Sequence, residues 1–174
     1  MRYTYATLLL LCVCSPAPSV HAQTPAGQGV IKELDTFLTA WHRAAAEADE
    51  ELYFGSLAPD AVFLGTDSTE RWVKPEFENW AMPYFQRPSA WVFYAESRHI
   101  FLSDDGNTAW FDELLHSESY WTCRGSGVLT RMAQGWKIRQ YNLAFTIPNE
   151  VTNEIKPIVE KALDKTSPLS ENGR

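Results

Sequence analysis

The sequence predicts an α+β domain in which a few helices gather on one side of a curved antiparallel sheet. Two observations point to this class. Apolar residues recur with helical spacing between Val30 and Ala48, whereas the stretch from Ala109 to Asn149 reads as three β-rich runs separated by turn residues. Because charges stand beside bulky aromatics in those runs, we expect a sheet with one covered face and a pocket. Helices and strands that are segregated along a chain favour α+β over alternating α/β.

Residues 1–22 read as a secretory signal peptide. Arg2 supplies a positive charge, Ala6–Val13 is an apolar run too short to span a bilayer, and Val20-His21-Ala22 resembles a small-residue cleavage site. A retained membrane anchor and a lipid anchor at Cys14 are the alternatives. We therefore expect an exported protein, periplasmic or secreted, with no membrane association in its mature form.

Charge and cysteine content narrow the function classes. Loss of residues 1–22 removes one Arg, which leaves 14 Lys and Arg against 22 Asp and Glu, a net charge of −8. This acidity argues against nucleic acid or an anionic membrane as the partner. Cys123 is then the single remaining cysteine, so an intramolecular disulfide is excluded and a buried, inert thiol is expected.

The mature domain is expected to span residues 23–149. Its first helix carries the apolar stripe, and His42 and Arg43 are interpreted as solvated because they lie off that stripe. A second, short helix begins at Asp49-Glu50-Glu51, where carboxylates favour a helix start. The run Ala61–Gly65 predicts a buried strand.

A third helix is expected from Pro75, which suits the first helical turn, with Phe77, Trp80 and Tyr84 on its packing face and Pro83 kinking or ending it. Residues 91–94 and 98–102 read as two further strands, closed by the turn 104–107. Residues 150–174 are expected to form a C-terminal helix laid on the body, followed by a disordered tail from Ser167.

With this order, four stretches resemble the SnoaL-like branch of the nuclear transport factor 2-like superfamily: residues 61–65, 77–85, 108–111 and 136–138. The resemblance implies a cone, in which a strongly bent sheet wraps around helices and leaves a cavity at its wide end. It also implies a homodimer formed through the outer sheet face. Relatives include ketosteroid isomerase, polyketide cyclases, scytalone dehydratase and non-enzymatic binding modules, so the fold does not fix the chemistry.

Asp112 and Glu113 are the candidate catalytic acids. They are adjacent in a strand, so one of them alone faces the cavity. Among aromatic neighbours such as Trp110, the inward carboxylate is expected to have a raised pKa and to suit acid/base work. A structural ion pair is the alternative. His99 is the candidate partner of that carboxylate if it faces inward, and a core histidine bonded to the backbone otherwise.

Candidate ligand-binding groups follow from strand alternation. If Lys137 and Arg139 face water, then Gln140 and Asn142 face inward; if Arg131 faces water, then Arg124 faces inward as well. Inward Arg124 is expected to pair with Asp112 or with a ligand carboxylate, and exposure at the strand start is the alternative.

The loop 66–71 and the aromatics supply further ligand-binding candidates. Asp67 and Glu70 either gate or bind at the cavity mouth, or cap the following helix, which is the favoured reading. The remaining candidates are aromatic. An aromatic wall is expected from four residues, of which at least half are expected to be plain core: Trp72, Trp80, Tyr84 and Trp91. Trp110 is a further ligand-binding candidate.

No metal-binding spacing, phosphate loop or dinucleotide fingerprint is present in the sequence, so no cofactor and no metal site is predicted. The expected function is the binding of a small, mostly apolar or aromatic molecule in the cone. The alternatives are a cofactor-independent acid/base enzyme (isomerase, dehydratase or hydrolase) that uses the inward carboxylate with His99, and a dimeric scaffold with a filled cone.

Overall fold

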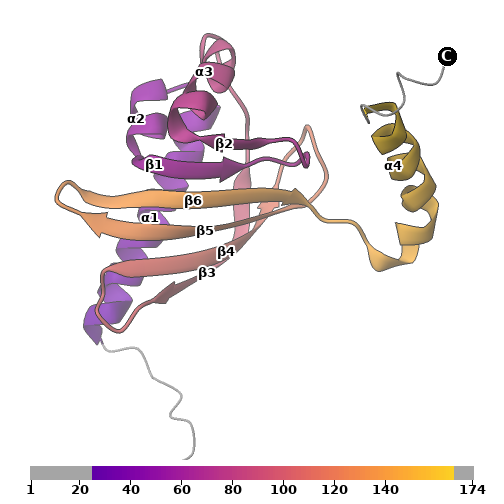
Figure 1. Ribbon diagram of the computed structural model, residues 1–174. Coiled ribbons are helices and arrows are strands. Elements are labelled where there is room, and N and C mark those ends of the chain that lie inside the picture. Colours follow the sequence, from indigo (N-terminus) through magenta and orange to yellow (C-terminus); the bar gives the residue numbers. More distant parts are fainter. Residues whose placement is uncertain (1–24, 167–174) are drawn as a thin grey trace, which may run out of the picture.

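The computed structural model describes residues 25–166 of the chain, so the predicted signal peptide and the tail from Ser167 lie outside the described residues. The elements are, in order, α1 (Pro25–Ala46), α2 (Glu50–Gly55), β1 (Leu57–Leu64), β2 (Arg71–Val73), α3 (Lys74–Phe85), β3 (Tyr94–Leu102), β4 (Thr108–His116), β5 (Cys123–Met132), β6 (Gly135–Phe145), the 3-10 helix η1 (Asn149–Val151) and α4 (Thr152–Thr166). Figure 1 shows the curved sheet with α1 crossing one face and with α2 and α3 gathered beside β1. The predicted α+β class is confirmed.

Within residues 25–166 the strands form one six-stranded sheet in the order β2-β1-β6-β5-β4-β3. Neighbouring strands are antiparallel, except that β1 and β6 run parallel. The two tight connections in the β3–β6 meander use glycines in the left-handed region, Gly106 at φ 69° and Gly135 at φ 102°. Strand β2 was not predicted, and β3 is one strand where two were expected.

The core lies between the helices and the concave face of the sheet. Leu34, Leu38 and Trp41 of α1 are fully buried, as the helical stripe predicted. Helix α2 begins at the predicted place, since the Asp49 carboxylate accepts the backbone N–H of Leu52 at 2.9 Å. In α3, Pro83 lies inside the helix without ending it.

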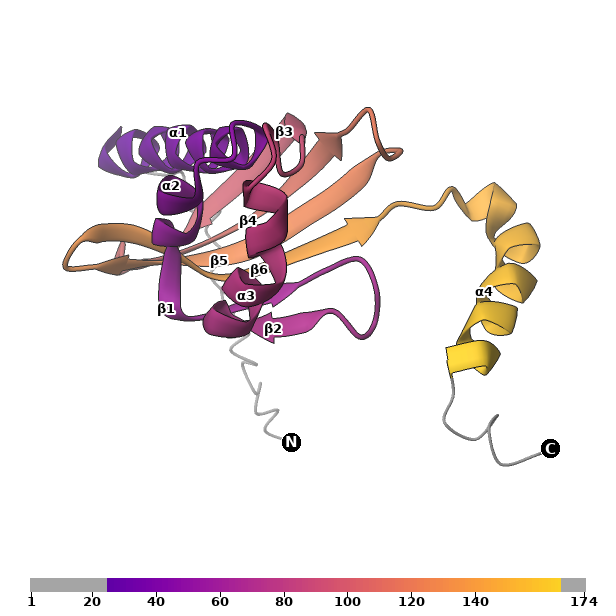
Figure 2. The same ribbon diagram turned by 90° about the horizontal axis from the view of Figure 1, so that it is seen from above.

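Helix α4 stands away from the rest of the molecule in both views (Figures 1 and 2). The expectation that it is laid on the body was wrong. Its apolar side chains are largely exposed, with Ile158 at 68%, because residues 146–148 carry the chain past the end of β6 before the helix begins. None of the helices within residues 25–166 has both the length and the apolar character that a membrane span requires.

Candidate functional site

Strand β4 turns Glu113 inward and Asp112 outward. Burial alternates along β4, so Ala109, Phe111 and Glu113 face the core, while Trp110 and Asp112 are exposed. The predicted separation of the two carboxylates onto opposite faces is confirmed, but the inward one, Glu113, does not line the cavity as expected. The Glu113 side chain is 0% exposed, which for a carboxylate requires that partners replace water.

Glu113 has three such partners, drawn from three different elements. His42 Nε2 of α1 lies 2.8 Å from one carboxylate oxygen, and the Tyr141 hydroxyl of β6 donates to the same oxygen at 3.0 Å. Arg98 Nε of β3 donates to the other oxygen at 2.8 Å. Arg98 is itself 4% exposed and reaches Asp35 Oδ1 of α1 at 2.6 Å. We call Glu113, His42, Arg98 and Tyr141 the Glu113 network.

The expected rise in the pKa of the inward carboxylate was wrong. Burial by itself would raise the pKa of Glu113, but the contacts with His42 and with the Arg98 guanidinium more than offset it and hold the pKa below the ordinary 4.5. Burial and the neighbouring carboxylate raise the pKa of Tyr141 well above 10.0, so its hydroxyl stays protonated and donates. Glu113 is therefore an ionised, fully bonded group rather than a poised acid or base.

Three residues of this network escaped the sequence analysis: His42, Arg98 and Tyr141. His42 was interpreted as solvated, but it is buried at 7% exposure, four residues after Leu38 and therefore on the buried face of α1. Arg98 shares its side of β3 with buried Ile100 and lies directly opposite Glu113 in the register. Alternation in the predicted strand already puts Arg98 on the side of Ile100, and what the sequence did not show is that this side is the inner one.

Gly125 leaves the space that the Glu113 network occupies. It faces inward on β5 opposite Glu113, and a Cβ there would clash with the Tyr141 hydroxyl and would lie 2.7 Å from Glu113 Oε1. No side chain larger than hydrogen fits at this position without displacing the carboxylate or the phenol.

His99 does not meet the inward carboxylate. It lies on the outer face of β3 and is paired there with Asp112, with 3.3 Å between Nδ1 and Oδ1 and both side chains more than half exposed. Neither predicted reading of His99 is correct: it does not pair with an inward acid, and at 65% exposure it is not a core histidine. Trp110 shares this outer face at 47% exposure, stacked on Phe101, so it does not line the cavity.

The alternation argument also misplaced three polar groups. On β5 the buried residues are Cys123, Gly125, Gly127 and Leu129, so Arg124 faces outward and is exposed. The prediction assumed that Arg131 lies on the outer side of β5 because it is exposed. Arg131 instead lies on the inner side, at the end of the strand, where it covers the Trp136 ring and remains exposed. Cys123 is buried and unpaired, as predicted.

On β6 a bulge reverses the alternation. Leu129 pairs with Ile138 and Val128 pairs with Gln140, which leaves Arg139 as an extra residue. Ile138 and Tyr141 are therefore both buried, whereas Gln140 is exposed and Asn142 lies opposite outward-facing Ser126. Both were predicted to face inward, and both predictions were wrong for this reason.

The cavity lies at the end of the cone bounded by the β1–β2 loop, α3, the segment between α3 and β3, and the β4–β5 loop. Its volume is about 380 Å³, and half of the side chains that line it are aromatic. All four candidates for the aromatic wall line the cavity, although at least half of them were expected to be plain core. They are Trp72, Trp80, Tyr84 and Trp91. Trp72 and Trp80 are stacked with ring centroids 4.6 Å apart.

Two charged side chains line the cavity, Glu70 and Arg87, together with the hydroxyls of Thr66, Ser117 and Ser119. Asp67 is not among the lining residues. Its carboxylate accepts the backbone N–H and the hydroxyl of Thr69 at 2.9 and 2.7 Å, which lowers its pKa and closes its own turn instead of capping α3. Arg87 and the two serines were missed because they follow elements whose ends the sequence did not fix.

The Glu113 network is separated from this cavity by Phe63. That ring lines the cavity and packs against Tyr141 with centroids 5.5 Å apart, and none of the four network residues is among the lining side chains. Among the described lining residues Glu70 is the single carboxylate, and none is a histidine. The inward acid is thus a structural group of the core, and the cavity is an aromatic chamber with charges at Glu70 and Arg87.

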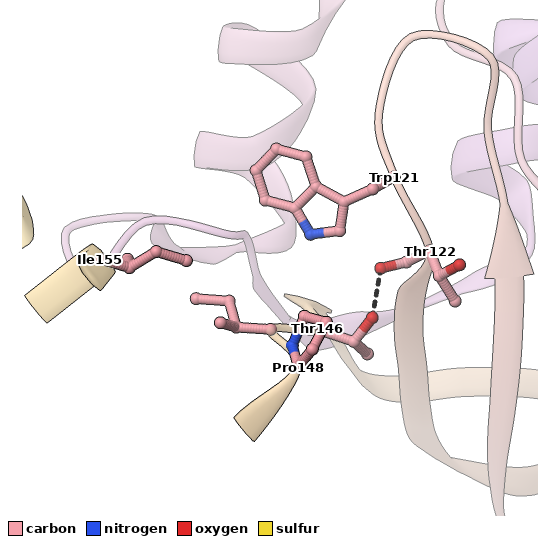
Figure 3. Close-up of a pocket in the computed structure, with 6 residues that line it drawn as sticks. Trp121, Thr122, Thr146, Pro148 and Ile155 are labelled. Carbon is pink, nitrogen blue, oxygen red and sulfur yellow. Dashed lines mark hydrogen bonds between the residues drawn. The ribbon is translucent and has the colours of Figure 1, made fainter. Parts of the chain in front are cut away.

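A second hollow, of about 380 Å³, lies where α4 leaves the sheet (Figure 3). Trp121, Pro148 and Ile155 border it, and the Thr146 hydroxyl donates to the Thr122 carbonyl at 2.5 Å. None of the described residues that border it is charged, and all of them lie in the segments 121–122, 146–148 and at Ile155. Within the described residues no cluster of three or more His, Cys, Asp or Glu side chains is placed to hold a metal ion.

Solved structures with the same architecture belong to NTF2-like proteins. One from Pseudomonas putida KT2440, of unknown function, gives a TM-score of 0.58 at 14% identity and covers 71% of this chain and 92% of its own. A candidate dehydratase of the NTF2-like family from Streptomyces avermitilis gives a TM-score of 0.59 at 15% identity and covers 72% of this chain and 100% of its own. A candidate ketosteroid isomerase from Parabacteroides distasonis ATCC 8503 gives a TM-score of 0.56 at 13% identity and covers 72% of this chain and 94% of its own. At these identities the likeness establishes the fold alone.

A comparison with curated proteins found no match. The sequence profile of the SnoaL-like domain, however, matches residues 34–148, which include every strand of the sheet and most of α1. The predicted resemblance is confirmed, and the chain belongs to the SnoaL-like domain family.

Proposed function

We propose that this SnoaL-like domain binds a small, mostly apolar or aromatic molecule in the cavity of its cone. The observation that carries the proposal is the aromatic lining of a chamber of about 380 Å³. That volume lies at the small end of the range of roughly 300–1,000 Å³ that small-molecule sites occupy. A scaffold with a filled cone would leave no such space.

The composition of the wall favours a flat ligand. Trp80 is 40% exposed although it belongs to α3, and its ring stacks on Trp72 from one side. A large aromatic surface left in contact with water inside a concave site is the feature that apolar ligands cover. The absence of a carboxylate–histidine pair among the described lining residues makes binding a better-supported reading than acid/base catalysis.

The test is ligand-observed NMR with a neutral aromatic probe, indole-3-ethanol, on the wild type and two variants. Trp80→Ala removes an exposed ring from the cavity, while Trp110→Ala removes a comparably exposed ring from the outer sheet face. We expect the wild type and Trp110→Ala to bind the probe equally and Trp80→Ala to bind it at least about fivefold more weakly, the scale of one lost aromatic contact. Absence of binding to the wild type, or equal weakening by both variants, refutes the proposal.

We also propose that the protein forms a homodimer through the outer sheet face. Phe101 and Trp110 are 43% and 47% exposed there and stack with centroids 5.8 Å apart, and Leu114 and Val128 extend the apolar surface across β4 and β5. Light scattering after size exclusion tests this: Trp110→Lys is expected to be monomeric, whereas Trp121→Lys, at an exposed ring off this face, keeps the dimer. A monomeric wild type refutes the proposal.

A further inference from the structure

The cavity holds two opposite charges that do not pair with each other. Glu70 and Arg87 both line it, and among the described residues neither takes part in an ion pair. The remaining lining side chains are neutral, so the chamber offers one anion and one cation in an aromatic setting. A ligand that carries both complementary charges would use every feature of this wall.

Arg87 is fixed in a position suited to a carboxylate. Its backbone N–H donates to the Tyr84 carbonyl at 3.1 Å, which ties it to the last turn of α3. Its guanidinium lies over the Tyr84 ring, 4.6 Å from the centroid. No hydrogen bond to the guanidinium N–H groups of Arg87 is present among the described residues, so these groups are available for a bidentate pair with a carboxylate.

Glu70 is held by the β1–β2 loop. Its backbone closes the β1–β2 loop, since its carbonyl accepts the Gly65 N–H at 2.8 Å and its N–H donates to the Asp67 carbonyl at 3.0 Å. One carboxylate oxygen accepts the Asp67 N–H at 3.2 Å, and the side chain lies so close to Gly65 that no Cβ fits there. The second oxygen has no hydrogen-bond donor among the described residues, so it is available to a donor on a ligand.

Aromatic rings strengthen the case for a cationic group beside Glu70. Trp72 and Trp80 lie in the same cavity wall, and the face of an aromatic ring attracts a cation. The protein as a whole is acidic, with a net charge of −7. An anionic ligand without a cationic group would therefore be attracted by Arg87 but repelled by the net negative charge of the protein.

We propose that the natural ligand is an aromatic zwitterion, a planar ring that carries a carboxylate bound by Arg87 and an ammonium bound by Glu70, as in an aromatic amino acid or a close derivative. This inference rests on the proposed binding function and names the ligand class of the same cavity.

The test compares four indole probes by ligand-observed NMR: tryptophan (zwitterion), indole-3-propanoate (anion), tryptamine (cation) and indole-3-ethanol (neutral). The variants are Arg87→Gln and Glu70→Gln. The matched controls are Arg43→Gln and Glu47→Gln, which make the same changes in net charge at an exposed pair at the C-terminal end of α1 that does not line the cavity.

Tryptophan is expected to bind the wild type most tightly. Arg87→Gln should raise the Kd of tryptophan and indole-3-propanoate roughly fivefold, the scale of a solvent-exposed charge pair, and leave tryptamine unchanged or tighter. Glu70→Gln should weaken tryptophan and tryptamine to the same extent and spare the anion. The control variants should change no Kd by more than about twofold, because they act through the long-range field alone.

Three outcomes overturn the inference: all four probes bind the wild type equally, either cavity variant acts no more strongly than its control, or Glu70→Gln fails to weaken tryptamine. Each of these outcomes counts against the inference only if indole-3-ethanol binds to the wild type. If that neutral probe does not bind at all, the proposed function itself fails, so the two failures are distinguishable.

Discussion

Replacement of Glu113 by glutamine tests the assignment of the inward acid to the core. The change keeps the shape of the side chain but removes its charge and gives it an amide group that donates. The partners would then be mismatched, because Arg98 Nε at 2.8 Å and the Tyr141 hydroxyl at 3.0 Å both donate to the carboxylate in the native protein. Arg98, which is 4% exposed, would retain Asp35 as its single carboxylate partner.

The expected loss is large because the buried Arg98 guanidinium loses one of its two carboxylate partners. Removal of one partner of a buried ion pair costs about 3–5 kcal/mol. For a domain of this size, roughly 2–4 °C of Tm corresponds to each kcal/mol, so Tm should fall by roughly 6–20 °C in a circular dichroism melt. Tyr141→Phe removes one hydrogen bond to the same carboxylate and should cost about 1.5–3 kcal/mol.

The control lies next to Glu113 in the same strand. Asp112→Asn changes the neighbouring carboxylate, whose side chain is half exposed and paired with His99 at 3.3 Å, and it should cost less than about 1 kcal/mol. If Asp112→Asn destabilises as much as Glu113→Gln, or if Glu113→Gln unfolds within about 1 kcal/mol of the wild type, the account of the Glu113 network is refuted.

Because the pKa of Glu113 in the folded protein lies below 4.5, its contribution to stability is complete above pH 4.5 and disappears as the pH falls through the folded pKa. The Tm difference between the wild type and Glu113→Gln should therefore be constant from pH 7 to pH 5 and should narrow in more acidic buffers. Gly125→Ala should lower the free energy of unfolding in urea by about 1–3 kcal/mol, because the added Cβ has no room beside Glu113. The control is Gly29→Ala in α1, where an added Cβ meets no atom within 4 Å. It should be neutral or stabilising by up to about 1 kcal/mol. Removal of residues 150–174 should change the free energy of unfolding by less than about 1 kcal/mol, since Ile158 and its neighbours on α4 are exposed; a larger loss would mean that α4 packs on the body in solution.

The elements were predictable where local signals were strong. The apolar stripe of α1, the carboxylates that start α2, and the turns at Gly106 and Gly135 all lie where the sequence placed them. These signals depend on residues within a few positions of one another, which is why a single chain read in order reveals them. Strand β2 is only three residues long and gave no such signal.

The candidate site was predicted in part, for a different physical reason. Alternation fixes which residues of a strand share a face, and it correctly separated Asp112 from Glu113. It does not say which face is the inner one, and the choice of Arg131 as an outward marker placed Arg124 on the wrong side. A single bulge at Arg139 then reversed the rest of β6, a feature set by pairing with β5 and not by the local sequence.

The sequence by itself therefore determined the family, the cone architecture and the burial of Cys123, and it named four aromatic candidates for the cavity wall without deciding whether they line a cavity or fill the core. The tertiary structure alone decided that Glu113 is satisfied by His42, Arg98 and Tyr141, and that Arg87 and Glu70 share a chamber with Trp80. The reason is that these contacts join residues from separate helices, strands and loops. Whether a carboxylate is a reactive group or a bonded core residue depends on such distant partners, which no local pattern in the chain contains.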